Sequence, residues 1–292
     1  MEPEYALIGH PLGHSLSPQL HQRLFRLAGR PGSYRLLDLP PEEFSAGSTA
    51  ARLRALAGFN VTIPYKTAVI PLLDGLDDEA RFYGAVNTVA CRNGRLLGSN
   101  TDAAGFVQAL RQAGAEEALT GRVCVAGAGG AARALALEAA RRGGQVTLAV
   151  RPTSRQRASD LCRQMAQRGL PPAQVCAAEA LGGGWDLLAN ATPAGMFPNT
   201  GTMAVPPGAF EGSQVVFDAV YNPAETLFLR TARGCGCRCV GGMAMLAWQS
   251  AIAHRFWNGD EYDPAAVAAL AGELCAVLEA PARQLTKEDS LH

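Results

Sequence analysis

The chain has 292 residues, 48% of them hydrophobic, which is enough to fill the cores of two domains of ordinary size. Its 26 basic and 26 acidic residues cancel, so no overall field would attract nucleic acid or an anionic membrane. The first apolar run, residues 5–8, is too short for a signal peptide or a membrane span, and we expect a cytoplasmic protein.

Short apolar strands alternate with helices over the first hundred residues. Strands are predicted at 5–9, 58–63, 85–91 and 96–99, and a helix at 18–27. Asn93-Gly94, between the last two strands, is a strong signal for a two-residue hairpin. A helical pattern at 103–113 would then carry the chain into the next domain.

From Gly121 the pattern becomes that of a parallel sheet. A strand at 122–126, a glycine turn, a helix at 131–142 and a strand at 145–150 form one strand–helix–strand unit. Later strands are predicted at 185–189, 215–220 and 235–240, and apolar helices at 243–257 and 264–279. These last helices have no further strands to join, so we expect them to fold back onto the first domain. The fold class is α/β.

Eight cysteines are present, and we expect them to be reduced thiols rather than metal ligands. Five are isolated in apolar segments, as small core residues often are. Cys235, Cys237 and Cys239 form C-x-C-x-C, which lacks the spacing of a zinc knuckle and has no nearby histidine. Their period of two favours side chains that face one way from a strand.

The segment Gly127-Ala128-Gly129-Gly130-Ala131-Ala132 fits the dinucleotide-binding pattern G-x-G-x-x-[GA]. It lies between a predicted strand and a predicted helix, which is the context that gives this short pattern its meaning. Small residues there permit a tight turn, and the helix N-terminus offers N–H groups to a pyrophosphate. The candidate residues are Gly127, Gly129, Gly130 and Ala131; a glycine-rich loop without a ligand is the alternative.

The end of the next strand favours NADP over NAD. An NAD site normally carries an acid at this point to hold the ribose hydroxyls, but the strand ends Leu148-Ala149-Val150-Arg151. Residues 141–168 contain seven Arg and one acid, Asp160, and such cations suit a 2′-phosphate. The candidates are Arg151 and Arg155, with Arg157 as a further possibility and Arg163 and Arg168 explained as solvated helix residues.

Lysine is nearly absent, since 24 of the 26 basic residues are Arg. Lys287 lies in the polar C-terminal tail, whereas Lys66 lies in a segment that is expected to fold. Guanidinium stays protonated while a desolvated ammonium can titrate, so Arg cannot replace Lys as a proton carrier. The pattern favours a catalytic Lys66; chance survival of one lysine is the alternative.

Four segments of the first domain place polar side chains in apolar surroundings. Paired hydroxyls before a helix, at Ser15 and Ser17, suit a carboxylate, although Ser17 could instead be the helix N-cap. The other polar positions are Asn60, Thr62 and Lys66, which alternate along one extended segment, Asn87, and Asp102, whose alternative is again an N-cap.

Together these segments resemble the shikimate dehydrogenase family nearly end to end. The matching motifs are Gly9-x-Pro11…His14-Ser15-x-Ser17-Pro18, Asn60-Val61-Thr62-Ile63-Pro64-Tyr65-Lys66, Gly84-Ala85-Val86-Asn87-Thr88, Asn100-Thr101-Asp102, Gly127-Ala128-Gly129-Gly130-Ala131, Asn190-Ala191-Thr192-Pro193-x-Gly195-Met196, Asp218-x-x-Tyr221-x-Pro223 and Met245-Leu246-x-x-Gln249. The resemblance implies a substrate-binding domain of 1–103 and 242–292, a Rossmann-type NADP-binding domain of 104–241, and an active-site cleft between them.

The resemblance also implies roles for individual residues. Ser15 and Ser17 would bind the substrate carboxylate, Thr62, Asn87, Asp102 and Gln249 the ring hydroxyls, and Tyr221 would wall the pocket. Lys66 and Asp102 would serve proton transfer and titrate as a unit, and Asn190, Thr192 and Met245 would line the nicotinamide side. Val150 and Pro152 depart from the family pattern around Arg151, so Thr153 or Ser154 would have to replace the N–H that Pro152 lacks.

The expected activity is reversible NADPH-dependent reduction of 3-dehydroshikimate to shikimate in aromatic amino acid biosynthesis. We expect a monomer or homodimer with no metal and with no nucleic-acid or membrane partner. Within the same class, the alternative is a quinate/shikimate dehydrogenase with broader substrate or NAD use, since the space beside Ser15 decides between the two. From a different class, the alternative is a non-catalytic metabolite sensor, against which the presence of both Lys66 and Asp102 argues.

Overall fold

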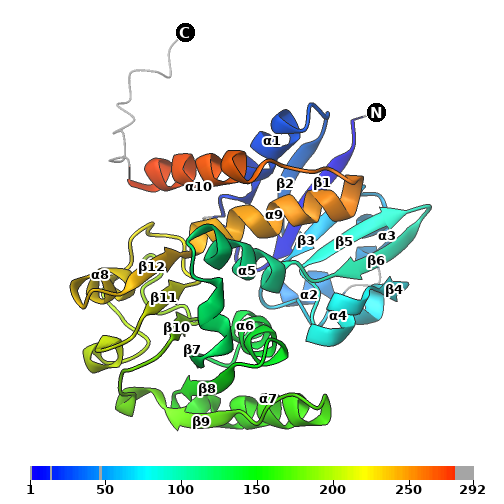
Figure 1. Ribbon diagram of the computed structural model, residues 1–292. Coiled ribbons are helices and arrows are strands. Elements are labelled where there is room, and N and C mark those ends of the chain that lie inside the picture. Colours follow the sequence, from blue (N-terminus) through cyan, green and yellow to red (C-terminus); the bar gives the residue numbers. More distant parts are fainter. Residues whose placement is uncertain (1, 14, 46–47, 280–292) are drawn as a thin grey trace.

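Two separate β-sheets organise the protein, and each comes from a different stretch of the chain (Figure 1). The computed structural model describes residues 2–13, 15–45 and 48–279. The first sheet is built from residues 4–99 and the second from residues 122–241. His14 of the first motif, Lys287 of the tail, and residues 280–292 of the expected substrate-binding domain lie outside the described residues.

The first sheet mixes parallel and antiparallel strands. They are β1 (Glu4–Gly9), β2 (Ser33–Asp38), β3 (Gly58–Val61), β4 (Gly75–Leu76), β5 (Thr88–Arg92) and β6 (Arg95–Ser99), in the order β2-β1-β3-β5-β6-β4. β1 is parallel to β2 and β3, whereas β5 is antiparallel to β3 and β6. Asn93 and Gly94 have φ of 52° and 74°, which confirms the predicted two-residue hairpin between β5 and β6.

Helices surround this sheet at its connections. They are α1 (Ser17–Leu27), α2 (Pro41–Phe44), α3 (Ser48–Arg54), the 3₁₀ helix η1 (Ile70–Leu72) and α4 (Asp78–Tyr83). α4 begins at an N-cap, where the Asp77 carboxylate accepts a hydrogen bond from the N–H of Ala80, and it ends at Gly84 in the left-handed conformation. This ending directs the chain into β5.

The second sheet is entirely parallel. Its strands are β7 (Arg122–Ala126), β8 (Gln145–Val150), β9 (Gln174–Ala177), β10 (Leu187–Asn190), β11 (Val215–Asp218) and β12 (Arg238–Gly241), in the order β12-β11-β10-β7-β8-β9. The connections hold η2 (Glu116–Thr120), α6 (Gly130–Arg141), η3 (Pro152–Ser154), α7 (Arg155–Gln167), η4 (Ala178–Ala180), η5 (Pro207–Phe210) and α8 (Leu227–Gly234). The order reverses between β7 and β10, as in a doubly wound dinucleotide-binding sheet, so the predicted α/β class with a Rossmann-type half is confirmed.

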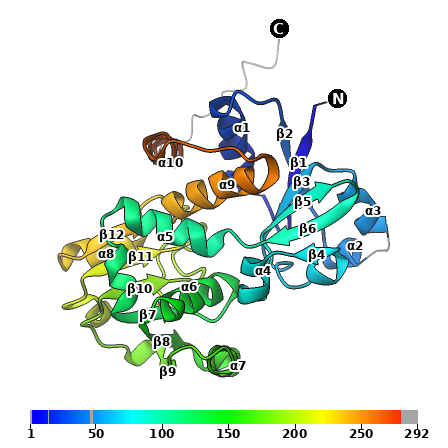
Figure 2. The ribbon, with the colours of Figure 1, turned by 45° about the vertical axis from the view of Figure 1, so that its right-hand side comes forward.

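Two long helices lie side by side between the sheets, as Figures 1 and 2 both show. They are α5 (Asp102–Gln112) and α9 (Gly242–Asn258). A Cβ at Gly105 would lie 2.7 Å from the Cβ of Gln249, so the missing side chain allows the two backbones to approach closely. α9 and α10 (Pro264–Glu279) also pack with α1 in one apolar cluster, which confirms that the C-terminal helices return to the first half.

The predicted elements agree with these bounds to within three residues at each end. The strands β2, β4 and β9 were not predicted, because all three are edge strands with partly exposed residues and carry no continuous apolar run. The expected domain boundaries, after residue 103 and after residue 241, fall inside α5 and directly before α9. The division into domains and the cleft between them remain predictions.

The prediction for the C-x-C-x-C segment is wrong in part. Cys235 is the exposed C-cap residue of α8, and Gly236 turns the chain with φ of 80° before β12 begins at Arg238. The buried Cys237 and the half-buried Cys239 donate from their sulfurs to the carbonyls of Phe210 and Leu229. A helix end and a turn therefore interrupt the expected strand, and all eight cysteines are free thiols.

Within the described ranges, no helix has the length and apolar character needed to cross a bilayer. In the same part of the chain, no group of three or more His, Cys, Asp or Glu side chains is arranged to hold a metal ion.

A pair of buried histidines joins α1 to α9. The side chains of His21 and His254 are 1% and 0% exposed, and His21 Nδ1 lies 3.0 Å from His254 Nε2. Tyr262 donates its hydroxyl proton to the carbonyl of Leu24, so its oxygen accepts from His254 Nδ1, and His254 Nε2 must accept from His21. Burial lowers the pKa of His21 well below 6.5 and that of His254 to about 4, against the opposing charge of Asp260.

We predict that this pair makes the protein less stable as the pH falls below 6.5. In that range the histidine is protonated in the unfolded state but stays neutral in the folded state. His254 alone therefore lowers the free energy of unfolding by about 2 kcal/mol between about pH 6.5 and pH 5. His254→Gln removes this titration, so its free energy of unfolding should depend less on pH over the same interval. Urea unfolding of both proteins at the two pH values measures the difference; parallel pH dependences would contradict the prediction.

Candidate active site

The centre of the site is an ion pair between Lys66 and Asp102. Lys66 lies in the turn after β3, and Asp102 is the first residue of α5. Lys66 Nζ is 2.6 Å from Asp102 Oδ2, and the two side chains are 17% and 8% exposed. Thr101 occupies the N-cap position, so the alternative interpretation of Asp102 as an N-cap is wrong. The structure therefore brings together the two residues predicted to serve proton transfer, and each charge compensates the other in a largely buried place.

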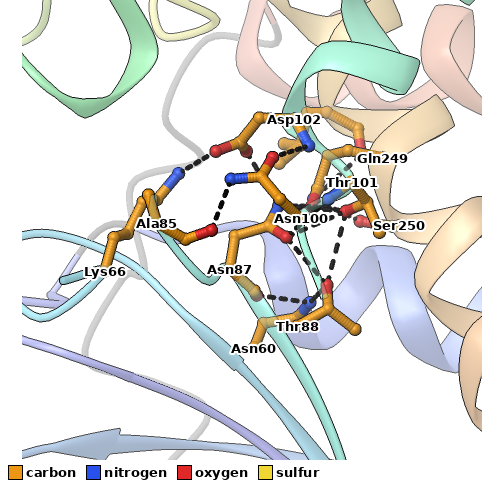
Figure 3. A network of polar contacts seen from close by, with 11 residues as sticks. Asn60, Lys66, Ala85, Asn87, Thr88, Asn100, Thr101, Asp102, Gln249 and Ser250 are labelled. Atoms are coloured by element: carbon orange, nitrogen blue, oxygen red, sulfur yellow. Dashed lines mark hydrogen bonds and ion pairs between the residues drawn. The ribbon is translucent and has the colours of Figure 1, made fainter. Parts of the chain in front are cut away.

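Asn87 holds the second oxygen of this carboxylate (Figure 3). Its amide nitrogen donates to Asp102 Oδ1 at 2.8 Å and also reaches Thr101 Oγ1 at 2.9 Å and Gln249 Oε1 at 3.2 Å. Its amide oxygen accepts from the N–H of Thr101 at 2.8 Å. Because the two Asp102 oxygens have different partners, the plane of the carboxylate is fixed and one edge faces Lys66.

Three residues that the predictions left without a role support this network. Thr101 is 1% exposed and bonds both Asn87 and Gln249. Asn60 donates to the carbonyl of Asn87 and to Thr88, and it accepts from the Tyr34 hydroxyl. Asn100 accepts from the N–H of Asp102 and donates to the carbonyl of Ala85, as Figure 3 shows. In the sequence, the run of polar residues 99–102 between an apolar strand and an apolar helix is the signal that could have indicated the supporting role of Asn100 and Thr101.

A second polar group lies at the start of α1. Leu16, not Ser17, is at the N-cap position, so the capping interpretation of Ser17 is wrong. Ser15 donates to the Ser17 hydroxyl at 3.0 Å and accepts from the N–H of Ser17 at 3.3 Å. The Tyr221 hydroxyl bonds Ser15 and the backbone of Leu16, and burial raises the pKa of Tyr221. These hydroxyls, together with Tyr221, form one cluster, as the predicted carboxylate site requires. Thr62 is half-buried, and its methyl group faces Gly9.

The glycine loop lies directly beside the lysine. Gly127 directly follows β7 with φ of 115°, and a Cβ there would come within 3.0 Å of Thr192 Cγ2. Gly129 is the N-cap of α6, and no atom lies within 4 Å of the place its Cβ would take. The Cβ position of Gly130 is 3.7 Å from Lys66 Cδ, and Ala131 follows in the first helical turn. The open space before free helix N–H groups fits a pyrophosphate.

The end of β10 forms the other wall of this loop. Asn190 is 0% exposed; its amide nitrogen donates to Asp218 at 2.9 Å, and its oxygen accepts from the N–H and the hydroxyl of Thr192. Asp218 also accepts from the N–H of Val220 and from the Thr226 hydroxyl, while burial raises its pKa to about 6. Asn190 therefore holds Thr192 in place against the glycine loop. Asp218 in turn holds Asn190, a role that the sequence motif did not indicate.

Arg151 and Arg155, which were predicted to bind a 2′-phosphate, lie just after β8. Both are exposed, and neither has a side-chain partner in the described part of the chain. Arg157 reaches Ser154 at 3.5 Å, whereas Arg163 pairs with Asp160 along α7. Met245, predicted for the nicotinamide side, is a buried residue of α9 whose side chain packs with the core of the second sheet.

A Rossmann-type sheet with a glycine loop, and a Lys–Asp pair beside that loop at the turn after β3 and the start of α5, define a dinucleotide-dependent dehydrogenase. Residues 7–89 match the family model described as the shikimate dehydrogenase substrate binding domain. A relative from Rubrobacter xylanophilus, named shikimate dehydrogenase (NADP(+)), is 44% identical over 276 residues, which cover 91% of this chain and 95% of the relative. The chain belongs to the shikimate dehydrogenase family.

Solved structures agree with this assignment. The shikimate 5-dehydrogenase of Thermus thermophilus, solved in complex with NADP(H) and shikimate, is 36% identical with a TM-score of 0.81, covering 93% of this chain and 99% of that one. The ligand-free 5-ketofructose reductase of a Gluconobacter species is 28% identical with a TM-score of 0.79, covering 94% and 99%. Since proteins with different named activities share the architecture, the substrate must be argued from the site.

Proposed function

We propose that this protein reduces 3-dehydroshikimate to shikimate with NADPH, and that it catalyses the reverse reaction. The observation that carries the proposal is the Lys66–Asp102 ion pair, whose lysine stem lies 3.7 Å from the Cβ position of Gly130 in the dinucleotide loop. The relative from Rubrobacter xylanophilus is named shikimate dehydrogenase (NADP(+)), and the Thermus thermophilus enzyme was solved in complex with NADP(H) and shikimate. The product belongs to the route that leads to aromatic amino acids.

The residues of the glycine loop would hold the cofactor. Gly127, Gly129, Gly130 and Ala131 present backbone N–H groups at the N-terminus of α6, where the helix dipole favours a pyrophosphate. Arg151 and Arg155 would bind the 2′-phosphate, and Thr192 and Met245 would face the nicotinamide side, with Asn190 holding Thr192 in place. The bound cofactor supplies a hydride to the carbonyl carbon of the substrate.

Lys66 would provide the proton. As the carbonyl oxygen gains negative charge, the Nζ of Lys66 stabilises it and donates a proton to it. The Asp102 carboxylate keeps Nζ in place, and because Asn87 holds the other carboxylate oxygen, the carboxylate stays oriented toward Lys66. In the oxidative direction the same pair accepts the hydroxyl proton.

The hydroxyl-rich surfaces would orient the substrate. Ser15 and Ser17 would bind the carboxylate at the N-terminus of α1, with Tyr221 closing that side. Thr62, Asn87, Asp102 and Gln249 would bind ring hydroxyls. Asn87 and Gln249 already bond each other, so a bound hydroxyl group would share or replace the 3.2 Å contact between them.

Reduction of NADP and of NAD by the purified protein, with shikimate and quinate each offered, tests the proposal. We expect turnover with shikimate and NADP and little with the other combinations. Comparable rates with quinate or NAD would contradict it and support the broader quinate/shikimate enzyme, and NADP binding without turnover would support the sensor. Neither alternative is favoured by a specific contact. Cytoplasmic location and a monomeric or dimeric state remain predictions from the sequence.

Replacement of Lys66 should reduce turnover far more than binding. Lys66→Ala removes the proton donor and leaves the Ser15 cluster intact, so kcat should fall roughly 10²- to 10⁴-fold while the Kd of shikimate changes little. Ser15→Ala is the matched control, because it touches only the carboxylate site and should mainly weaken binding. Steady-state kinetics and isothermal titration measure both quantities; equal losses in kcat and in affinity for Lys66→Ala would exclude the catalytic role.

Cofactor preference should depend on Arg151. Arg151→Ala removes an exposed guanidinium without an intramolecular partner, so the KM for NADP should rise by about tenfold or more, while that for NAD stays nearly constant. Arg163→Ala is the control, since that guanidinium pairs with Asp160 on α7. Steady-state kinetics give the KM for NADP and the KM for NAD of each variant. A parallel change in both values for Arg151→Ala would show that Arg151 does not bind the 2′-phosphate.

A further inference from the structure

An arginine of the dinucleotide-binding helix reaches into the half that carries Lys66 and Asp102. Arg133 lies in the first turn of α6, three residues after Gly130. Its Nε donates to the main-chain carbonyl of Tyr83, the last residue of α4. Neither the glycine-loop motif nor the predicted catalytic residues account for this contact.

The absence of a side chain at Gly84 leaves room for the same guanidinium. Gly84 has φ of 60°, and a Cβ at this position would come within 2.9 Å of Arg133 Nη2. Any side chain there would therefore push against the arginine. Arg133 thus packs on the main chain of residues 83–84 as well as bonding to it, and its place depends on the absence of a side chain at Gly84.

The segment that follows Gly84 holds both members of the ion pair. The carbonyl of Ala85 accepts from Asn100, the N–H of Val86 donates to the carbonyl of Lys66 at 2.7 Å, and Asn87 donates to Asp102. Any movement of this segment would consequently be passed to both charged residues through direct hydrogen bonds.

The N-terminus of α6, the helix that carries Arg133, lies beside Lys66. α6 begins at Gly130, whose Cβ position is 3.7 Å from Lys66 Cδ. The helix that would carry the pyrophosphate therefore begins close to the lysine, and Arg133 bonds it to the segment that positions that lysine. This closed arrangement fixes the distance between the dinucleotide loop and the Lys–Asp pair.

A second contact between α4 and α6 holds the helices together independently. The Tyr83 hydroxyl donates to Glu138 at 2.7 Å, and the buried Glu138 carboxylate is paired with Arg141 and Arg142. Loss of the Arg133 side chain would leave this contact intact, so a variant at Arg133 should still fold. Glu138 lies five residues further along the helix than Arg133, away from the glycine loop.

We propose that Arg133 is a positioning residue: by bonding Tyr83 and packing on Gly84, it sets the dinucleotide-binding helix against the segment that holds Lys66 and Asp102. The inference rests on the proposed dehydrogenase function. Its consequence is that Arg133 governs the geometry of hydride transfer rather than the affinity for either ligand, because a small displacement of reacting groups greatly lowers the rate.

Arg133→Met tests the proposal, since it keeps the apolar stem and removes every donor. With shikimate and NADP, kcat should fall roughly 10- to 100-fold, and the kinetic isotope effect with shikimate deuterated at the carbon that loses hydride should rise. The Kd of each ligand alone should change by less than about threefold. Arg133→Lys, which can still reach the Tyr83 carbonyl, should recover part of the lost rate.

Two results would overturn the proposal. A kcat for Arg133→Met within about twofold of the wild-type value would show that the contact does not position the helix. A large rise in the Kd of NADP with unchanged kcat would show that Arg133 binds cofactor phosphates instead. Absence of wild-type turnover would refute the proposed function and this inference together, whereas normal wild-type turnover with an unaffected variant refutes the inference alone.

A pair of glycine variants tests the same contact from its other side. Gly84→Ala and Gly29→Ala both place a side chain at φ of 60°, so both carry the same backbone strain, but nothing lies within 4 Å of the Cβ position of Gly29. Both should therefore lose thermal stability through this strain, while only Gly84→Ala should lower kcat, by about fivefold or more. Equal kcat values in the two variants would contradict a positioning role for Arg133.

Discussion

The close crossing of α5 and α9 at Gly105 is the constraint on which the rest of the site depends. α5 begins with Asp102, and α9 brings Gln249 to the same point only because no side chain separates the two backbones. The Trp248 indole donates to Gln112 at 2.7 Å and so joins the two helices further along α5, while the Trp257 indole joins α9 to the first sheet by donating to the carbonyl of Val89. A chain segment that ends the second sheet thereby becomes part of a site on the first.

Buried charge in the site is consistently compensated, which is what a low-dielectric environment demands. Lys66 and Asp102 neutralise each other, and Asp218 accepts from three donors on different segments. Such arrangements stabilise a fold less than well-packed apolar residues would, so their presence is better explained by chemistry than by stability. Asp218 and the His21–His254 pair also oppose each other in their effect on stability below pH 6, since one pKa is raised and the others are lowered.

Much of the fold and of the site could be predicted from local sequence. The strand, glycine turn and helix at residues 122–142, the Asn93-Gly94 hairpin and the conspicuous Lys66 each depend on residues that lie close together in the chain. Alternatives that the sequence left open were decided by the tertiary surroundings. An N-cap role was the alternative for both Ser17 and Asp102, and only the structure shows the cap position one residue earlier in each helix. The cysteine triplet failed because Gly236 ends a helix inside the expected strand.

The sequence by itself determined the fold class, the dinucleotide loop and the conspicuous Lys66, because periodicity, glycine spacing and a rare residue type can be read from short segments. The role of Asp102 beside Lys66 came from the resemblance to the family. Only the tertiary structure decided which side chains complete the site. Arg133 meets Tyr83 across a separation of 50 residues, and Asn87 meets Gln249 across 162. Contacts of this kind arise when helices and sheets pack, since distant backbones are brought to hydrogen-bonding distance by burial of apolar faces elsewhere, and no local pattern encodes them.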